Sequence, residues 1–278
     1  MTKIEPPLVP GGDAPRSVAV HYSLSLRKLC VLTAAFPFLA LVICLVTAVI
    51  FQPDEVHETH CRVYNVIPSI SAITGVSPQR YLWRLSVALH ITPRYVIATA
   101  YKRYLHGLIS SLATLETKKR IHRWLSIAHV LNIVEVSALA GVTYISNIEN
   151  YPIHEKLFIT FMFTSLGHML ASIKALQLIA ETRSDFHTFD KEIFIKKCLL
   201  LTSMVCTIGM IVFFAEHRLL CHDLAFSRFA FCEYVVATAN MAFHCSLVFR
   251  LEEERLVIIT GLESAWDRKV LNNEKKGD

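Results

Sequence analysis

Residues 29–51 carry no charged side chain over 23 consecutive positions, and this run constrains the fold most strongly. A helix of this length, at about 1.5 Å per residue, covers the roughly 30 Å hydrocarbon core of a bilayer. The run is too long for a signal-peptide core, and no small-residue cleavage site follows it. We therefore expect an uncleaved first membrane span.

The chain as a whole is also apolar. Of its 278 residues, 53% are hydrophobic and 18% are charged, and its mean hydropathy is +0.43. These values exclude an ordinary soluble domain. The sequence predicts an all-α, polytopic membrane helix bundle over residues 29–249 with six transmembrane helices, at 29–51, 81–101, 124–146, 157–180, 198–215 and 229–249.

The basic residues are distributed unevenly between the two sides of such a bundle. Twenty Lys and Arg residues lie in one set of segments, 1–28, 102–123, 181–197 and 250–278, against five in the loops 52–80, 147–156 and 216–228. Because short loops rich in positive charge stay in the cytoplasm, both termini are expected in the cytosol and the three loops in the lumen. The net charge of +5 is thus explained by topology, and no nucleic acid partner is expected.

Two polar tails flank the predicted bundle. The N-terminal tail, 1–28, is expected to be disordered, and the C-terminal tail, 250–278, to include a short amphipathic helix over 251–270. The last four residues, KKGD, have the form of a dilysine retrieval signal of early secretory membranes.

Cys61 and Cys221 are the two cysteines that lie outside the apolar segments, and both fall in loops expected in the lumen. In an oxidising compartment they would form a disulfide, which we predict. A zinc site that combines them with histidines is the alternative, although the spacings match no zinc pattern; its further members would be His57, His60, His217 and His222. We predict no metal and identify no cofactor.

Ionisable and amide side chains recur inside four predicted spans. Each charge in hydrocarbon costs about 2.5–3.5 kcal/mol, so such groups face the bundle interior, where they pair or serve function. Helical spacing places them in one stripe per span. The candidates are Arg84, His90 and Arg94 in the second span, His129, Asn132 and Glu135 in the third, His168 in the fourth, and Glu233, Asn240 and His244 in the sixth.

Their depths follow from the helical rise. Arg84 and Glu233 lie roughly 5 Å below the lumenal surface, close enough for an ion pair, and four others share a level about 15 Å deep; these are His90, Glu135, His168 and Asn240. Such a layer suits proton transfer, and it equally suits a satisfied structural network. Arg94 lies further toward the cytosolic side.

The loop before the second span contains hydroxyl side chains among apolar residues: Ser69, Ser71, Thr74 and Ser77. A re-entrant hairpin could present one of them as a nucleophile. The alternative is a cap over the bundle in which Pro68, Gly75 and Pro78 shape the turns and the hydroxyls satisfy them. No G-x-S-x-G motif supports a serine hydrolase.

Several of these segments together resemble the post-GPI attachment to proteins factor 2 family from about residue 27 to 260. The segments are HETHC at 57–61, IPSISAITGVSPQRYLWR at 67–84, LHITPR at 89–94, LNIVE at 131–135, IHE at 153–155, SLGHML at 165–170 and EYVVATANMAFH at 233–244. The resemblance implies a multi-pass protein of Golgi and endoplasmic reticulum membranes that remodels the lipid of GPI anchors. Its expected partners are GPI-anchored proteins or lyso-GPI lipid, together with membrane lipids.

That implied function, reacylation of lyso-GPI with a saturated chain on the lumenal side, requires a base for the lipid hydroxyl and donors for the oxyanion. We predict His90 or His168 as base, with Glu135 orienting it. Predicted substrate-binding residues are Arg84, Arg94, Asn132, Glu233, Asn240 and His244. The sequence names no acyl donor. Two alternatives stay open, a non-catalytic lipid-binding accessory subunit and a lipid or proton-coupled transporter.

Overall fold

A computed structural model of the chain describes residues 19–109, 113–182, 187–251 and 253–260. Within these ranges the chain forms eight α-helices, a short 3-10 helix and two β-strands. Residues Cys30–Phe249 form one compact unit, and the described parts of the two terminal segments form a second. The helices make up the first unit.

Six long helices correspond one to one to the six predicted spans and confirm the expected all-α bundle. They extend past most of the predicted ends, because polar residues continue the helices beyond the apolar runs. Their bounds are α1 (Leu26–Phe51), α4 (Gln79–Gly107), α5 (Leu115–Tyr144), α6 (Tyr151–Glu181), α7 (His187–Leu220) and α8 (Ala225–Cys245). The 3-10 helix Ser246–Phe249 follows α8.

Four of the described helices are long and apolar enough to cross a membrane, namely α1, α5, α6 and residues Phe189–Leu220 of α7. Helices α4 and α8 are not in this set. Helix α4 contains Arg84 and Arg94, and α8 contains Arg228 and Glu233, which lower their hydropathy. That α4 and α8 also span the bilayer stays a prediction, as does the cytosolic location of the termini.

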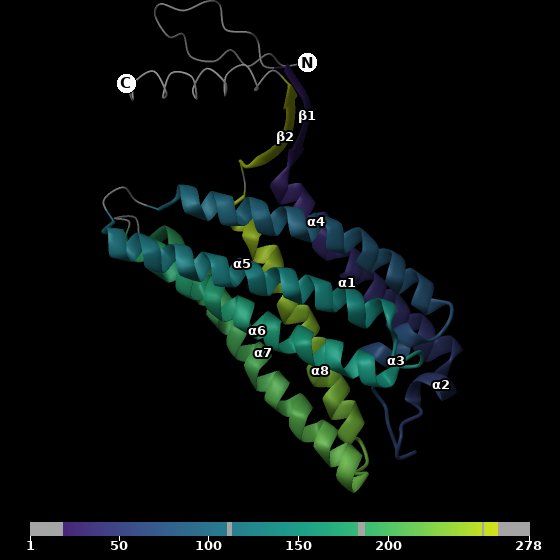
Figure 1. Cartoon of the computed structure of the whole chain (residues 1–278). Coiled ribbons are helices and arrows are strands. Elements are labelled where there is room, and N and C mark those ends of the chain that lie inside the picture. The colour runs from purple at the N-terminus through teal and green to yellow at the C-terminus, as the bar shows by residue number, and fades with distance from the viewer. Residues whose placement is uncertain (1–18, 110–112, 183–186, 252, 261–278) are drawn as a thin grey trace, which may run out of the picture. The chain divides into compact units, whose positions relative to one another are not determined.

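From α4 to α8, each long helix packs against the next one in the chain. In the view of Figure 1, α8 passes behind α5 and α6. Small residues allow close approach between α5 and α6. A Cβ atom on Gly141 of α5 would lie 2.8 Å from Leu157 Cδ2 of α6. Glycine at this position therefore brings the two helix backbones close together.

The predicted loop 52–80 contains two short helices, α2 (Pro53–His57) and α3 (Ile70–Gly75). The Ser69 hydroxyl accepts a hydrogen bond from Ala72 N at 3.2 Å and caps α3. This agrees with the alternative in which the hydroxyls of this loop satisfy its turns, because a side-chain oxygen here satisfies one of the free N–H groups at a helix start. We refer below to the end of the bundle where α3 lies as the α3 end.

A disulfide joins Cys61, which lies between α2 and α3, to Cys221, which directly follows α7; their Cα atoms are 5.5 Å apart. The predicted pairing is confirmed. Because both sulfur atoms are bonded to each other, the alternative zinc site loses its two thiolate ligands.

The terminal segments differ from their predictions where the structure describes them. Strand β1 (Ala19–Ser25) pairs antiparallel with β2 (Arg255–Thr260), with Ala19 opposite Thr260 and Ser25 opposite Arg255. The predicted disorder is thus wrong for residues 19–28, and the predicted helix over 251–270 is wrong for residues 255–260. Residues 1–18, 261–270 and the KKGD terminus lie outside the described ranges.

Candidate functional site

An ion pair between two buried side chains lies at the centre of the bundle. Arg94 of α4 donates from Nη2 to Glu135 Oε1 of α5 at 3.1 Å, and their side chains are 5% and 0% exposed. Arg94 Nη2 also donates to Asn132 Oδ1 at 3.2 Å. Since an unpaired charge at this burial is strongly destabilising, each side chain requires the other.

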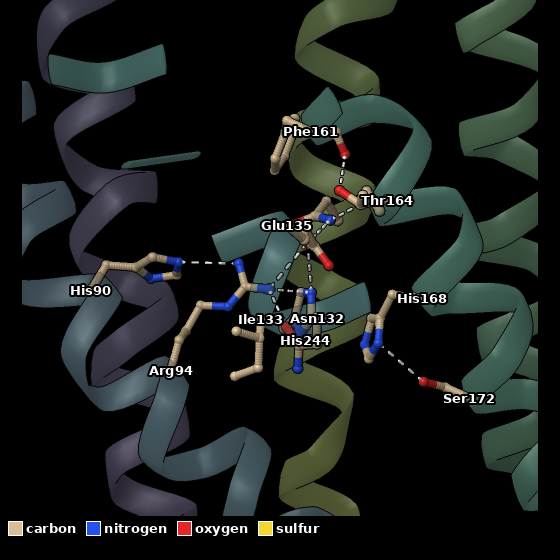
Figure 2. A network of polar contacts seen from close by, with 12 residues as sticks. His90, Arg94, Asn132, Ile133, Glu135, Phe161, Thr164, His168, Ser172 and His244 are labelled. Atoms are coloured by element: carbon tan, nitrogen blue, oxygen red, sulfur yellow. Dashed lines mark hydrogen bonds and ion pairs between the residues drawn. The ribbon is translucent and has the colours of Figure 1, made fainter. Parts of the chain in front are cut away.

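Helix α8 contributes two side chains to the same carboxylate oxygen. His244 Nε2 lies 3.0 Å from Glu135 Oε1, and Asn240 Nδ2 donates to that oxygen at 2.8 Å. Asn240 Nδ2 donates a second hydrogen bond to Ser165 Oγ of α6 at 2.7 Å. Figure 2 shows the side chains of this network converging from separate helices. Four helices are thereby joined by one set of polar contacts, which we call the core network.

His90 and His168 lie at its two edges. His90 Nδ1 is 2.6 Å from the Thr33 carbonyl oxygen of α1, and its Nε2 is 3.3 Å from Arg94 Nη1. His168 Nδ1 is 2.9 Å from the Ala128 carbonyl oxygen, and its ring stacks on His244 with centroids 5.1 Å apart. Because carbonyl oxygens only accept, both Nδ1 atoms carry the proton. The His90 Nε2 lone pair therefore accepts from Arg94.

A cavity of about 110 Å³ reaches the core network from the α3 end. Its walls are apolar, and include Leu41, Trp83, Val87, Leu139, Phe158 and Val236. His90, Arg94 and Asn240 line what we call its inner end, whereas Glu135 and His168 do not line it. Of the three predicted catalytic residues, His90 thus reaches the cavity and the other two lie behind it. The catalytic assignment itself stays a prediction.

Arg94 is more central than its sequence position suggested. It contacts four of the predicted site residues, His90, Asn132, Glu135 and His244. Spacing along one helix places a residue in depth, but an arginine side chain extends over several ångströms and moves its charge away from its own Cα level.

Within the described residues, Glu135, His168 and His244 offer ligand atoms that all lie within 4.8 Å of one another, and two histidines with a carboxylate match a zinc ligand set. Arg94, however, already supplies a positive charge at Glu135 Oε1 and contacts His244 Nε2. A metal ion would add further positive charge to this buried site and displace Arg94 from His244. These residues therefore do not fit a metal centre.

The predicted ion pair of Arg84 with Glu233 is wrong. Arg84 Nη2 instead donates to Glu149 Oε2 at 2.6 Å and to the Tyr144 carbonyl oxygen at 2.9 Å. Glu233 Oε2 accepts a hydrogen bond from Ile70 N of α3 at 2.8 Å. Glu149 lies in the short connection between α5 and α6, which brings it closer to Arg84 than α8 does.

Glu149 should give a pH-dependent contribution to stability. The hydrogen bonds from Arg84 and from Ser146 lower the pKa of Glu149 to about 2. A carboxylate with a lowered folded-state pKa stabilises the fold above its unfolded pKa, and this contribution is lost as the pH falls through the folded value. The stability difference between wild type and Glu149→Gln is therefore expected to be constant above about pH 4.5 and to shrink toward pH 2. Unfolding midpoints measured across this range check it, and a difference that stays constant down to pH 2 would contradict it.

Sequence reasoning did not find three residues of this region: Ser165, Thr33 and Glu149. Ser165 is three residues before His168 and so lies on the same helix face, a signal that was available. Thr33 contributes only its backbone carbonyl, and Glu149 lies outside the apolar runs. Patterns of side-chain polarity within the spans therefore do not predict the contact of His90 with the Thr33 carbonyl or that of Arg84 with Glu149.

The chain matches the Frag1/DRAM/Sfk1/Cwh43P N-terminal domain family over residues 25–253. It is 49% identical to a Drosophila melanogaster protein named post-GPI attachment to proteins factor 2-like, over 88% of this chain and 75% of that one. It is 32% identical to Acyltransferase PGAP2 of Xenopus tropicalis, over 90% of this chain and 97% of that one.

Post-GPI attachment to proteins factor 2 of Caenorhabditis elegans is 28% identical over 85% of this chain and 89% of its own length. No solved structure matches the chain. The matched family range contains every residue of the core network and all six long helices. The chain therefore belongs to the Frag1/DRAM/Sfk1/Cwh43P family and, within it, to the post-GPI attachment to proteins factor 2 proteins.

Proposed function

We propose that this protein remodels the lipid of GPI anchors, by reacylating lyso-GPI with a saturated chain on the lumenal side of Golgi and endoplasmic reticulum membranes. The observation that carries the proposal is the cavity, which has apolar walls and a few polar side chains in its lining. Such a site suits an amphiphile, because apolar walls accept a hydrocarbon chain while a few placed polar groups fix its oxygen atoms.

The relatives support the same activity. One is named an acyltransferase, and others are named for GPI attachment to proteins. The Lys and Arg distribution supports a cytosolic location of both termini and, with it, a lumenal location of the α3 end of the cavity. The Cys61–Cys221 disulfide at that end supports an oxidising compartment there.

The core network would form the inner wall of the lipid site. Arg94 and Asn240 line the cavity, and Glu135 accepts a hydrogen bond from each of them. Because the Nε2 lone pair of His90 is occupied by Arg94, His90 is better placed to orient the guanidinium than to accept a proton. The predicted substrate-binding role of Arg94 and Asn240 is kept in this proposal.

Reconstitution tests the activity. The purified full-length protein in phospholipid vesicles is expected to convert lyso-GPI and an acyl donor, offered as ester or thioester, to the diacyl form. Ala237→Phe, which fills the cavity from α8, should abolish this transfer. Thr238→Phe on the exposed face of the same helix should not. Both proteins should unfold at similar temperatures.

Binding of lyso-GPI without any transfer by the folded wild type would overturn the acyltransferase proposal in favour of the accessory lipid-binding role. Equal acyl transfer by Ala237→Phe and by wild type would show that the cavity is not the site of the reaction.

A further inference from the structure

The cavity has a second group of polar side chains, at the α3 end, which we call its outer end. These residues come from four helices and are Ser71, Thr74, Thr143, His154 and Glu233. His154 is in the first turn of α6, 11 residues before Ser165 of the core network, so about 16 Å separate the two levels along the helix. The outer end is therefore distinct from the core network.

Two polar atoms at the outer end have no partner within the described residues. Thr143 Oγ1 is buried, with the residue 5% exposed, and makes no hydrogen bond. His154 Nδ1 is 2.7 Å from the Ile145 carbonyl oxygen, so Nδ1 carries the proton and Nε2 has a lone pair. No hydrogen bond to His154 Nε2 is present in the described part of the chain. Because a buried polar group without a partner is rare, Thr143 Oγ1 indicates a ligand or water at this position. His154 is of intermediate exposure and lines the same cavity.

The unpartnered atoms complement a hydroxyl group. A hydroxyl donates one hydrogen bond and accepts others, so it can donate to His154 Nε2 and accept from Thr143 Oγ1. Thr74 Oγ1 donates to the Ile70 carbonyl oxygen at 2.7 Å and is therefore already engaged as a donor. At the inner end, by contrast, the His90 lone pair is taken by Arg94.

Access also favours the outer end. A phosphorylated headgroup cannot be drawn about 16 Å further along an apolar cavity without losing its hydration, whereas a hydroxyl near that headgroup reaches the outer end directly. The lipid hydrocarbon then lies along the apolar walls. The reacting oxygen and the orphaned polar atoms thus meet at one level.

From this geometry we infer that the outer end is the acceptor site of the proposed acyl transfer, with His154 as the base for the free hydroxyl of a single-chain phospholipid. His154 Nε2 takes the hydroxyl proton as the oxygen bonds to the carbonyl carbon of an acyl ester or thioester. The bond from that carbon to the donor's oxygen or sulfur breaks, and the leaving group takes the proton from Nε2. Thr143 holds the acceptor oxygen. The inference rests on the proposed function for its chemical step alone.

The kinetic test uses His154→Asn, which removes the base while retaining a side-chain amide that can donate to Ile145. Transfer to lyso-phosphatidylinositol in vesicles is expected to fall about 100-fold or more, since positioned bases contribute roughly 10²–10⁴-fold. His60→Ala is the matched control, because His60 is an exposed histidine in the loop that precedes α3, and it should keep full activity. A folded His154→Asn protein that transfers within about threefold of wild type would overturn the role of His154.

A binding test does not require any transfer. Wild type should bind lyso-phosphatidylinositol up to about tenfold more tightly than an analogue without the free glycerol hydroxyl, because the analogue leaves the polar atoms of the outer end without a hydrogen-bond partner. Thr143→Val should remove most of this difference. Equal affinities for the two lipids in wild type would overturn the acceptor site. If the difference is present but wild type transfers no acyl group, the site stands and the proposed reaction fails.

Discussion

Replacing Glu135 by glutamine is expected to lower the free energy of unfolding by about 3–5 kcal/mol, the usual cost of leaving one member of a buried ion pair uncompensated. The carboxylate is fully buried and neutralises Arg94, which contacts no other carboxylate among the described residues. Glutamine keeps the size of the side chain but loses the charge. Unfolding of the purified protein in mixed micelles, followed by tryptophan fluorescence against denaturant, measures the change.

Two further variants serve as comparisons for Glu135→Gln. Glu149→Gln makes the same chemical change in a half-exposed carboxylate that also pairs with an arginine, and it should cost much less at neutral pH. The double variant Arg94→Met/Glu135→Met should recover most of the stability lost in Glu135→Gln, because apolar side chains of similar volume can replace a buried pair. Equal losses in Glu135→Gln and Glu149→Gln would show that the core network does not depend on charge.

Removing the disulfide is expected to destabilise the protein by about 2–5 kcal/mol. Cys61 and Cys221 are separated by 160 residues, so their bond closes a long loop and restricts the unfolded chain strongly. The double variant Cys61→Ala/Cys221→Ala should unfold earlier than wild type under non-reducing conditions. Cys198→Ala, which removes an exposed free cysteine, is the matched control and should unfold like wild type.

Reductant gives an independent comparison. Dithiothreitol should lower the stability of wild type to that of the double variant and leave the variant unchanged. A wild-type midpoint that is insensitive to full reduction, verified by thiol counting, would contradict a stabilising role for this bond.

Several features of the fold followed from the sequence because they depend on local composition. Apolar runs located all six long helices, and the positions of Cys61 and Cys221 outside those runs identified the disulfide. Helical spacing also found the stripe residues that form the core network, since Asn132 and Glu135, or Asn240 and His244, share a face whatever the tertiary structure.

The contacts between helices were harder to predict. Depth along the helices suggested an ion pair between Arg84 and Glu233. Depth alone does not say which helices are neighbours, and Arg84 instead pairs with Glu149. The pairing of β1 with β2 joins segments over 200 residues apart, and neither alternates clearly enough to suggest a partner. The polar outer end of the cavity, with Thr143 and His154, is formed where four helices meet, and no single segment of the sequence encodes that meeting.

The ion pair between Arg94 and Glu135 also bears on how the chain enters its membrane during synthesis. Helix α4 by itself is too polar to be among the helices that qualify as spans, and a lone arginine near its middle costs about 2.5–3.5 kcal/mol on insertion scales. Helix α5, which does qualify, brings Glu135 to that arginine. On the prediction that both helices cross the bilayer, the α4–α5 hairpin is the smallest segment in which this charge is neutralised. Integration of α4 is then expected to be completed by the helix translated after it.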